Sequence, residues 1–245
     1  MKRRDFIKGS AIIGASVAVP SFLHSCSAMF TQTGNRKIRS VLNMKKVNVG
    51  TLPVLRAFAG DHTDYVSPFV LFDEFGPVNI TPGADALKVG AHPHAGVTPT
   101  TFFLDGSGHH KDSLDYDFQV NKGEFMMFNS GKGAIHMEES GEELKQNGGN
   151  LHGFQIWLNM PSKHKFDDPT TVVFKDEAMP TIVHRKFTAQ VVLGKLFRRK
   201  SSIETLSPAF YYHIKLHADN RLDIPVDPTH NAFLYTVKGK LELEG

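Results

Sequence analysis

The feature that most constrains the fold of this chain is a series of short runs rich in aromatic and β-branched residues. Glycine, proline, asparagine and aspartate separate these runs, and a helical spacing of apolar residues is scarce. The runs are Phe69–Phe75, Thr98–Leu104, Glu124–Phe128, His152–Asn159, Thr171–Phe174, Ala209–Leu216 and Ala232–Val237. Aromatic and β-branched residues favour strands, and the residues between the runs favour turns. Short strands with regular turns predict an all-β sandwich or barrel.

The segment 1–28 has the pattern of an export signal. Lys2, Arg3 and Arg4 precede a weakly apolar stretch that is too short and too mild to span a membrane. The segment Arg3–Lys8 resembles the twin-arginine signal, whose pathway carries folded proteins across the bacterial inner membrane. We therefore expect export by the twin-arginine route to the periplasm or envelope.

Cys26 is the single cysteine of the chain and leaves two alternatives for processing. Cleavage before Cys26 would give a lipoprotein anchored through this residue, whereas cleavage after Ala28 would release the protein without an anchor. Membrane contact is expected only through the signal or this lipid anchor. Either cleavage leaves a domain without cysteine, which excludes disulfides and thiolate metal ligands.

The charge of the chain is dominated by this leader. The leader contains four of the 28 basic residues, Lys2, Arg3, Arg4 and Lys8, and one of the 25 acidic residues, Asp5, which leaves 24 of each sign. The sequence pI of about 8.9 therefore derives mostly from the leader. A neutral domain gives no support to a nucleic-acid-binding surface, and no nucleic-acid partner is expected.

Two pairs of residues with metal-binding side chains stand out. His92 and His94 are one residue apart, and so are His136 and Glu138. Residues i and i+2 of a strand point to the same face, so two neighbouring strands would offer three imidazoles and one carboxylate to one ion. This set suits Fe(II), Mn(II), Ni(II), Cu(II) or Zn(II). The first pair alone would more often be two exposed loop histidines, but the second pair strengthens the prediction of a metal site.

Several stretches resemble the pirin family, which are bicupin proteins of the cupin superfamily. They are Pro68–Pro77, Ala91–Gly96, His110–Ser113, Lys122–Glu124, Ser130–Glu138 and Leu151–Pro161. The resemblance implies an N-terminal cupin barrel, a double-stranded β-helix or jelly-roll, that binds one iron ion. Carried over by motif, the implied ligands are His92, His94, His136 and Glu138, with Fe(II) as the expected cofactor.

The resemblance continues into the C-terminal part of the chain. Ser207–Tyr211 and His230–Gly239 resemble the opening of the second cupin of the family, and the remaining strands of that barrel are missing. We therefore expect an N-terminal metal-binding cupin at 40–165, a crossover at 166–185 and an incomplete second cupin at 186–245. An incomplete barrel would expose strand edges, through which the chain could self-associate.

Some residues near the expected site depart from the family or have uncertain roles. Ala95–Pro99 stands where the family usually has a large residue, often Arg, followed by Gly-Phe-Glu-Thr, so the basic and acidic groups beside the metal are expected to be lost. His109 and His110 are expected in a solvated turn, with gating or support of the site as the alternative. His152 is expected to be a satisfied core histidine. Met126 and Phe128 are expected to pack in the core, with a pocket wall as the alternative.

The resemblance implies an oxidoreductase of the quercetin 2,3-dioxygenase type that acts on a flavonol-like aromatic substrate. Glu138 is expected to be a metal ligand, with a role as general base if it leaves the metal. A second hypothesis is an iron-dependent regulator or binding protein whose redox state controls association with a partner, without turnover. A third is an inactive truncated relic.

Overall fold

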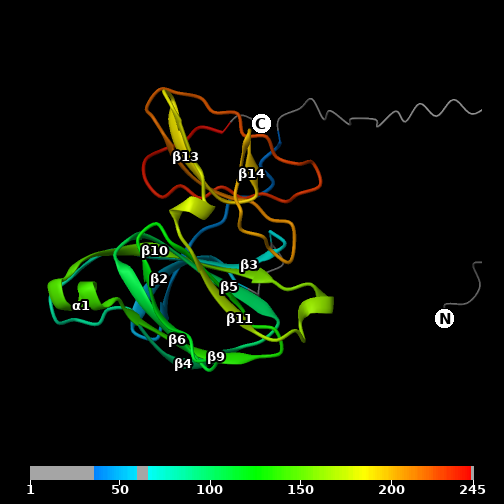
Figure 1. Cartoon of the computed structure of the whole chain (residues 1–245). Helices are drawn as coiled ribbons and strands as arrows, with labels where there is room; N and C mark the ends of the chain where they lie inside the picture. Colours follow the sequence, from blue (N-terminus) through cyan, green and yellow to red (C-terminus); the bar gives the residue numbers. More distant parts are fainter. Residues whose placement is uncertain (1–35, 60–65, 244–245) are drawn as a thin grey trace, which may run out of the picture. The chain divides into compact units, whose positions relative to one another are not determined.

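The computed structural model describes residues 36–59 and 66–243 of the chain (Figure 1). The predicted export signal at 1–28, including Cys26, lies outside the described residues. Within the described ranges, no helix is both long enough and apolar enough to cross a membrane.

Two antiparallel sheets build the N-terminal part of the described chain. The larger sheet has the strand order β1-β2-β3-β10-β5-β8-β11, and the smaller has the order β4-β9-β6-β7. The strands of the larger sheet are β1 (Lys45–Val49), β2 (Leu52–Phe58), β3 (Phe69–Ile80), β5 (Val97–Asp105), β8 (Phe125–Asn129), β10 (Gly149–Asn159) and β11 (Thr170–Phe174). The strands of the smaller sheet are β4 (Lys88–His94), β6 (Ser107–Asp112), β7 (Asp117–Asn121) and β9 (Ala134–Ser140). The all-β prediction is confirmed.

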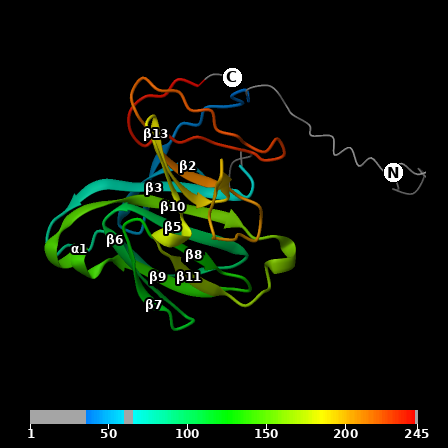
Figure 2. The same ribbon diagram turned by 45° about the horizontal axis from the view of Figure 1, so that its top comes forward.

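Strands distant in the sequence are neighbours in this fold. β10 pairs with β3 on one side and with β5 on the other, and Figure 2 shows β3, β10, β5 and β8 in succession across the larger sheet. A short helix, α1 (Glu142–Asn147), connects β9 to β10. Since β9 lies in the smaller sheet and β10 in the larger one, the chain passes between the sheets at this helix.

Alternation along the strands creates two separate apolar clusters. On β3, Asp73 and Phe75 line a cavity to which both sheets contribute, whereas Phe72 belongs to a cluster on the other face of the larger sheet. The adjacent residues Phe102 and Phe103 of β5 likewise belong to different clusters. Both faces of the larger sheet are therefore buried, which explains its nearly continuous aromatic and aliphatic sequence.

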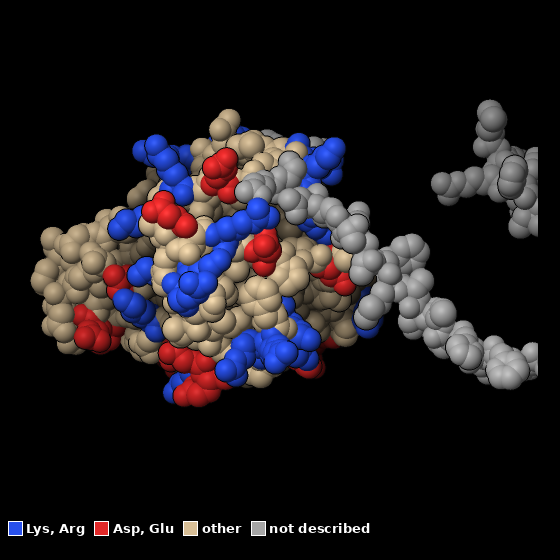
Figure 3. Space-filling view, turned by 90° about the horizontal axis from the view of Figure 1, so that it is seen from above, with Lys and Arg blue, Asp and Glu red and all other residues tan. Residues whose placement is uncertain are grey.

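The C-terminal part of the described chain contains two small sheets. They are the three-stranded sheet β12 (Thr181–His184), β13 (Phe187–Leu193) and β16 (Tyr211–Leu216), and the pair β14 (Lys195–Leu196) and β15 (Arg199–Lys200). Two 3-10 helices, η1 (Ser162–His164) and η2 (Asp176–Ala178), flank β11. β12 and β16 are the edges of their sheet, and self-association through such edges stays a prediction. One face of the molecule mixes basic and acidic side chains (Figure 3).

Aromatic residues near the C-terminus pack on the larger sheet. The ring centroid of Phe233 lies 5.3 Å from that of Phe58 and 5.2 Å from that of Phe72. The hydroxyl of Tyr235 donates a hydrogen bond to the buried carboxylate of Glu74. The strand predicted at Ala232–Val237 is wrong, because these residues pair with no other strand in the part of the chain that the structure describes. Their aromatic side chains pack on a sheet face instead.

Candidate metal centre

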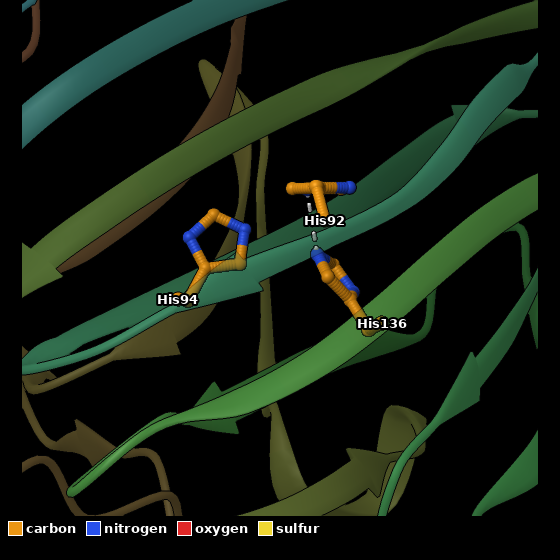
Figure 4. Close-up of side chains that lie close together, drawn as sticks. All are labelled: His92, His94 and His136. Atoms are coloured by element: carbon orange, nitrogen blue, oxygen red, sulfur yellow. Dashed lines mark hydrogen bonds between the residues drawn. The ribbon is translucent and has the colours of Figure 1, made fainter.

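Three histidines from two paired strands converge at one point. β4 and β9 are antiparallel, and their register places His92 directly opposite His136. His94 lies two residues after His92 on the same face, and the three rings point toward one another (Figure 4). Their ring centroids are 4.4 to 4.9 Å apart. One nitrogen atom from each ring lies within 4.8 Å of the other two, which is a group that can hold a metal ion.

The hydrogen bonds of these rings leave nitrogen lone pairs at the point of convergence. Nδ1 of His92 lies 2.8 Å from the carbonyl oxygen of Gly90, and a carbonyl can only accept. Nδ1 therefore carries the proton of a neutral His92, and its Nε2, 3.0 Å from Nε2 of His136, is a lone-pair donor. Nε2 of His94 is buried and has no hydrogen-bond partner. An unpaired buried nitrogen is costly, and a metal ion would satisfy it.

Burial keeps two of the three rings neutral. It lowers the pKa of His94 from 6.5 to about 4, with a further contribution from the charge of His92. Burial also lowers the pKa of His136 well below its usual value, helped by His92, His94 and His110. Only a neutral imidazole can bind a metal ion, so both rings are in the ligating form at neutral pH.

This lowered pKa gives a prediction for the stability of the metal-free protein. Between pH 6.5 and about 4 the unfolded chain binds a proton at His94 that the folded chain does not, so stability is lost as the pH falls through this window. The shift of His94 from 6.5 to about 4 corresponds to about 3 kcal/mol. We expect the unfolding free energy of a His94→Leu variant, measured with urea, to fall less over this window than that of the wild type. If the unfolding free energies of the two proteins fall equally over this pH window, the lowered pKa of His94 is contradicted.

Glu138, the fourth predicted ligand, lies beside the histidines without joining their group. In the described part of the chain, the set of ligand atoms within 4.8 Å contains the three histidines and not Glu138. Its carboxylate accepts a 3.4 Å hydrogen bond from the hydroxyl of Thr101, which donates more closely, at 2.7 Å, to Gln155. Burial raises the pKa of Glu138, although His110, His92 and Thr101 oppose this shift. A carboxylate with a raised pKa is suited to accept a proton.

A cavity of about 700 Å³ opens beside the histidines. His92, His94 and Glu138 form part of its wall, and most other lining side chains are apolar. The wall also contains Arg56 and Asp73, whose side chains form two parallel hydrogen bonds of 2.8 and 2.6 Å. The sequence predicts the loss of charged groups near the metal. It does not reveal this charged pair, because Arg56 and Asp73 lie on different strands and no spacing pattern joins them.

The predicted solvated turn at His109 and His110 is wrong. Both residues lie on β6, and His110 is 1 % exposed. Its ring stacks on Phe118 at 5.2 Å, and its Nε2 lies 2.9 Å from the carboxylate of Asp112. The alternation of β6 explains the difference, because it turns His109 to the opposite face, toward the exposed Asp117. The alternative reading, support of the site, agrees better with the position of His110.

The predictions for the other nearby residues are confirmed. Met126 and Phe128 are 1 % and 0 % exposed and do not line the large cavity. Phe128 packs instead against the ring of His136, with a centroid separation of 5.0 Å. His152 is a satisfied core histidine, since its Nε2 lies 2.7 Å from the carboxylate of Glu74.

The sequence of this region is similar to that of a known protein family. Residues 51–158 match the sequence model of the Pirin family. This segment is similar to the pirin domain. It contains all four predicted ligands, and the match together with the two-sheet architecture confirms the predicted all-β cupin fold. The domain boundaries at 40–165, 166–185 and 186–245 stay predictions.

Proteins similar to this chain come from bacteria and animals. The chain is 28 % identical to a pirin-like protein of Caulobacter vibrioides over 84 % of this chain and 71 % of the relative. It is 27 % identical to pirin of Homo sapiens over 82 % of this chain and 66 % of that protein. A solved structure of quercetin 2,3-dioxygenase from Acinetobacter baumannii is similar with a TM-score of 0.63 and 28 % identity, over 69 % of this chain and 60 % of that one. The chain thus spans about two thirds of the length of these relatives.

Proposed function

We propose that this protein binds one divalent metal ion, Fe(II) in the first instance, through His92, His94 and His136. We further propose that it is an oxidoreductase of the quercetin 2,3-dioxygenase type with a flavonol-like substrate. The observation that carries the proposal is the group of three imidazole nitrogens within 4.8 Å of one another, two of which belong to residues, His92 and His94, in the wall of a cavity of about 700 Å³. The likeness to a solved quercetin 2,3-dioxygenase supports the reaction class.

The residues of the cavity have separate tasks in this proposal. The apolar side chains, among them Leu52, Val54 and Leu71, cover the flat rings of the substrate and exclude water. Gln155 and the paired Arg56 supply polar groups that orient its oxygen atoms. The metal ion, when bound, supplies a Lewis acid that makes a coordinated phenolic oxygen more acidic.

Glu138 accepts the phenolic proton in this scheme. Its carboxylate lines the same cavity as His92 and His94, and burial raises its pKa toward that of a phenol. A raised pKa makes the carboxylate a stronger base. In the alternative that follows from the family resemblance, Glu138 turns toward the histidines and becomes the fourth ligand.

Oxygen uptake tests the proposal. Metal-free protein is loaded with Fe²⁺ without oxygen, and quercetin in air-saturated buffer is then added at a large excess over protein. We expect uptake of many oxygen molecules per protein molecule, which metal-free protein does not show. A loaded protein that retains its Fe²⁺ and consumes no oxygen with quercetin or related flavonols would overturn the dioxygenase proposal and leave a metal-binding protein.

A further inference from the structure

A buried pair of side chains lies behind the histidine group, on the side away from the large cavity. His110 and Asp112 share one face of β6 and are 1 % and 0 % exposed at their side chains. Nδ1 of His110 lies 3.4 Å from Nδ1 of His136, and neither His110 nor Asp112 lines the large cavity. The pair is therefore placed to act on His136 and not on a substrate.

The hydrogen bonds of Asp112 fix the direction of this chain of contacts. Its Oδ1 accepts from the backbone N–H groups of Leu114 at 2.9 Å and Tyr116 at 3.3 Å, and its Oδ2 accepts from the hydroxyl of Thr171 at 2.6 Å. A carboxylate with these donors is an acceptor toward His110 as well, at 2.9 Å. Nε2 of His110 must then carry the proton that it donates to Asp112.

The tautomer of His110 in turn sets the tautomer of His136. With its proton on Nε2, the neutral His110 has a lone pair on Nδ1 and accepts a hydrogen bond from Nδ1–H of His136. His136 then has its own lone pair on Nε2, the atom that lies 3.0 Å from Nε2 of His92. Two facing lone pairs repel each other, so this tautomer belongs to the metal-bound protein, in which the ion accepts both lone pairs; in the metal-free protein Nε2–H of His136 can donate to His92 instead. The alternative tautomer of His136 would direct an N–H group at the place where a metal ion binds.

We propose that His110, held by Asp112, is a positioning residue that keeps Nε2 of His136 deprotonated and aimed at the metal ion. This inference rests on the metal site of the proposed function. Partners of this kind orient ligating histidines and raise their basicity, and their loss weakens metal binding about 10- to 100-fold.

Asp112→Asn is the decisive variant because it preserves shape and reverses the hydrogen bonds. The backbone donors of Leu114 and Tyr116 hold the amide oxygen, so the amide NH₂ faces Nε2 of His110. His110 then accepts at Nε2, donates from Nδ1, and moves the proton of His136 to Nε2. We expect Fe²⁺ to bind about 10- to 100-fold more weakly without oxygen, by competition with a chelator.

Two further variants and one control make the effect specific. His110→Leu removes the acceptor for His136 and is expected to weaken binding, whereas His110→Asn offers an amide oxygen near Nδ1 and is expected to restore it. Asp117→Asn is the matched control, since Asp117 holds the neighbouring His109 on the outer face of the same strand and is 58 % exposed. We expect its Fe²⁺ affinity to equal that of the wild type.

Imidazole ¹⁵N–¹H correlation spectra of the proteins loaded with Zn²⁺, which unlike Fe²⁺ is diamagnetic, give a second readout, which a merely structural role would not change. We expect a hydrogen-bonded Nδ1–H of His136 in the wild type and an Nδ1–H without this hydrogen bond in Asp112→Asn. Equal Fe²⁺ affinities of these two proteins, or a wild-type His136 whose Nδ1–H forms no hydrogen bond, would overturn the positioning role alone. A wild type that binds neither Fe²⁺ nor Zn²⁺ would overturn the proposed function, and this proposal with it.

Discussion

Replacing His94 by leucine is expected to lower the metal affinity about 100-fold. The apparent binding energy of a structural four-ligand zinc site, about 10–16 kcal/mol, gives roughly 3 kcal/mol per ligand, which is about two powers of ten. Nε2 of His94 is buried without a hydrogen-bond partner, so no other group replaces it. Elemental analysis of protein purified without oxygen or chelators should find about one metal ion per wild-type chain and close to none in the variant.

The same substitution is expected to leave the metal-free protein at least as stable as the wild type at neutral pH. A buried polar atom without a partner costs about 1–3 kcal/mol, and leucine of similar volume removes that atom. Loss of metal without loss of stability would separate a ligand from a core residue. His109→Leu is the matched control, because His109 lies on the outer face of β6, and its metal content should equal that of the wild type. Full metal occupancy in His94→Leu would refute the three-histidine site.

Glu138→Gln is expected to retain the metal and to lose turnover with quercetin by about 10²- to 10⁴-fold, the usual contribution of a general base. Glutamine has the size of glutamate and can still accept the hydrogen bond from Thr101, but it cannot take up a proton. Since burial raises the pKa of Glu138, the acid limb of the wild-type pH–rate profile should lie above the ordinary value of 4.5. Below this limb the base is protonated and activity is lost.

The neighbouring carboxylate provides the control for this experiment. Glu139 lies next to Glu138 on β9, but its side chain forms an ion pair with Lys145. Glu139→Gln should therefore keep both metal and turnover. If Glu138→Gln loses the metal together with turnover, Glu138 is the fourth ligand and not the base. Wild-type turnover in this variant would contradict both roles.

The positions of several strands, and the side chains that share one face of a strand, could be predicted from the sequence. The run Thr98–Leu104 predicted most of β5 (Val97–Asp105), and the runs Glu124–Phe128 and Thr171–Phe174 predicted β8 and β11 within one residue. Side-chain alternation requires only the residues of one strand, so it also placed His92 and His94 on one face. The run Ala232–Val237 failed because aromatic residues favour a strand only where a partner strand exists.

The identity of the neighbouring strands had to come from the tertiary structure. β6 packs against β9, which brings His110 and Asp112 behind His136, although the sequence placed His110 in a solvated turn. β2 pairs with β3 and thereby joins Arg56 to Asp73 in the cavity wall. Neither contact leaves a periodic signal, because strand register depends on hydrogen bonds between segments far apart in the chain.

The sequence by itself determined the strand class, the resemblance to pirins and the four residues able to bind a metal ion. These properties reside in residue type and in a spacing of two, which any extended strand converts into a shared face. The tertiary structure decided that His92, His94 and His136 meet, that Glu138 stands apart from them, and that His110 with Asp112 supports His136 from behind. Each of these outcomes depends on distances between strands, which are set by the register and packing of the two sheets.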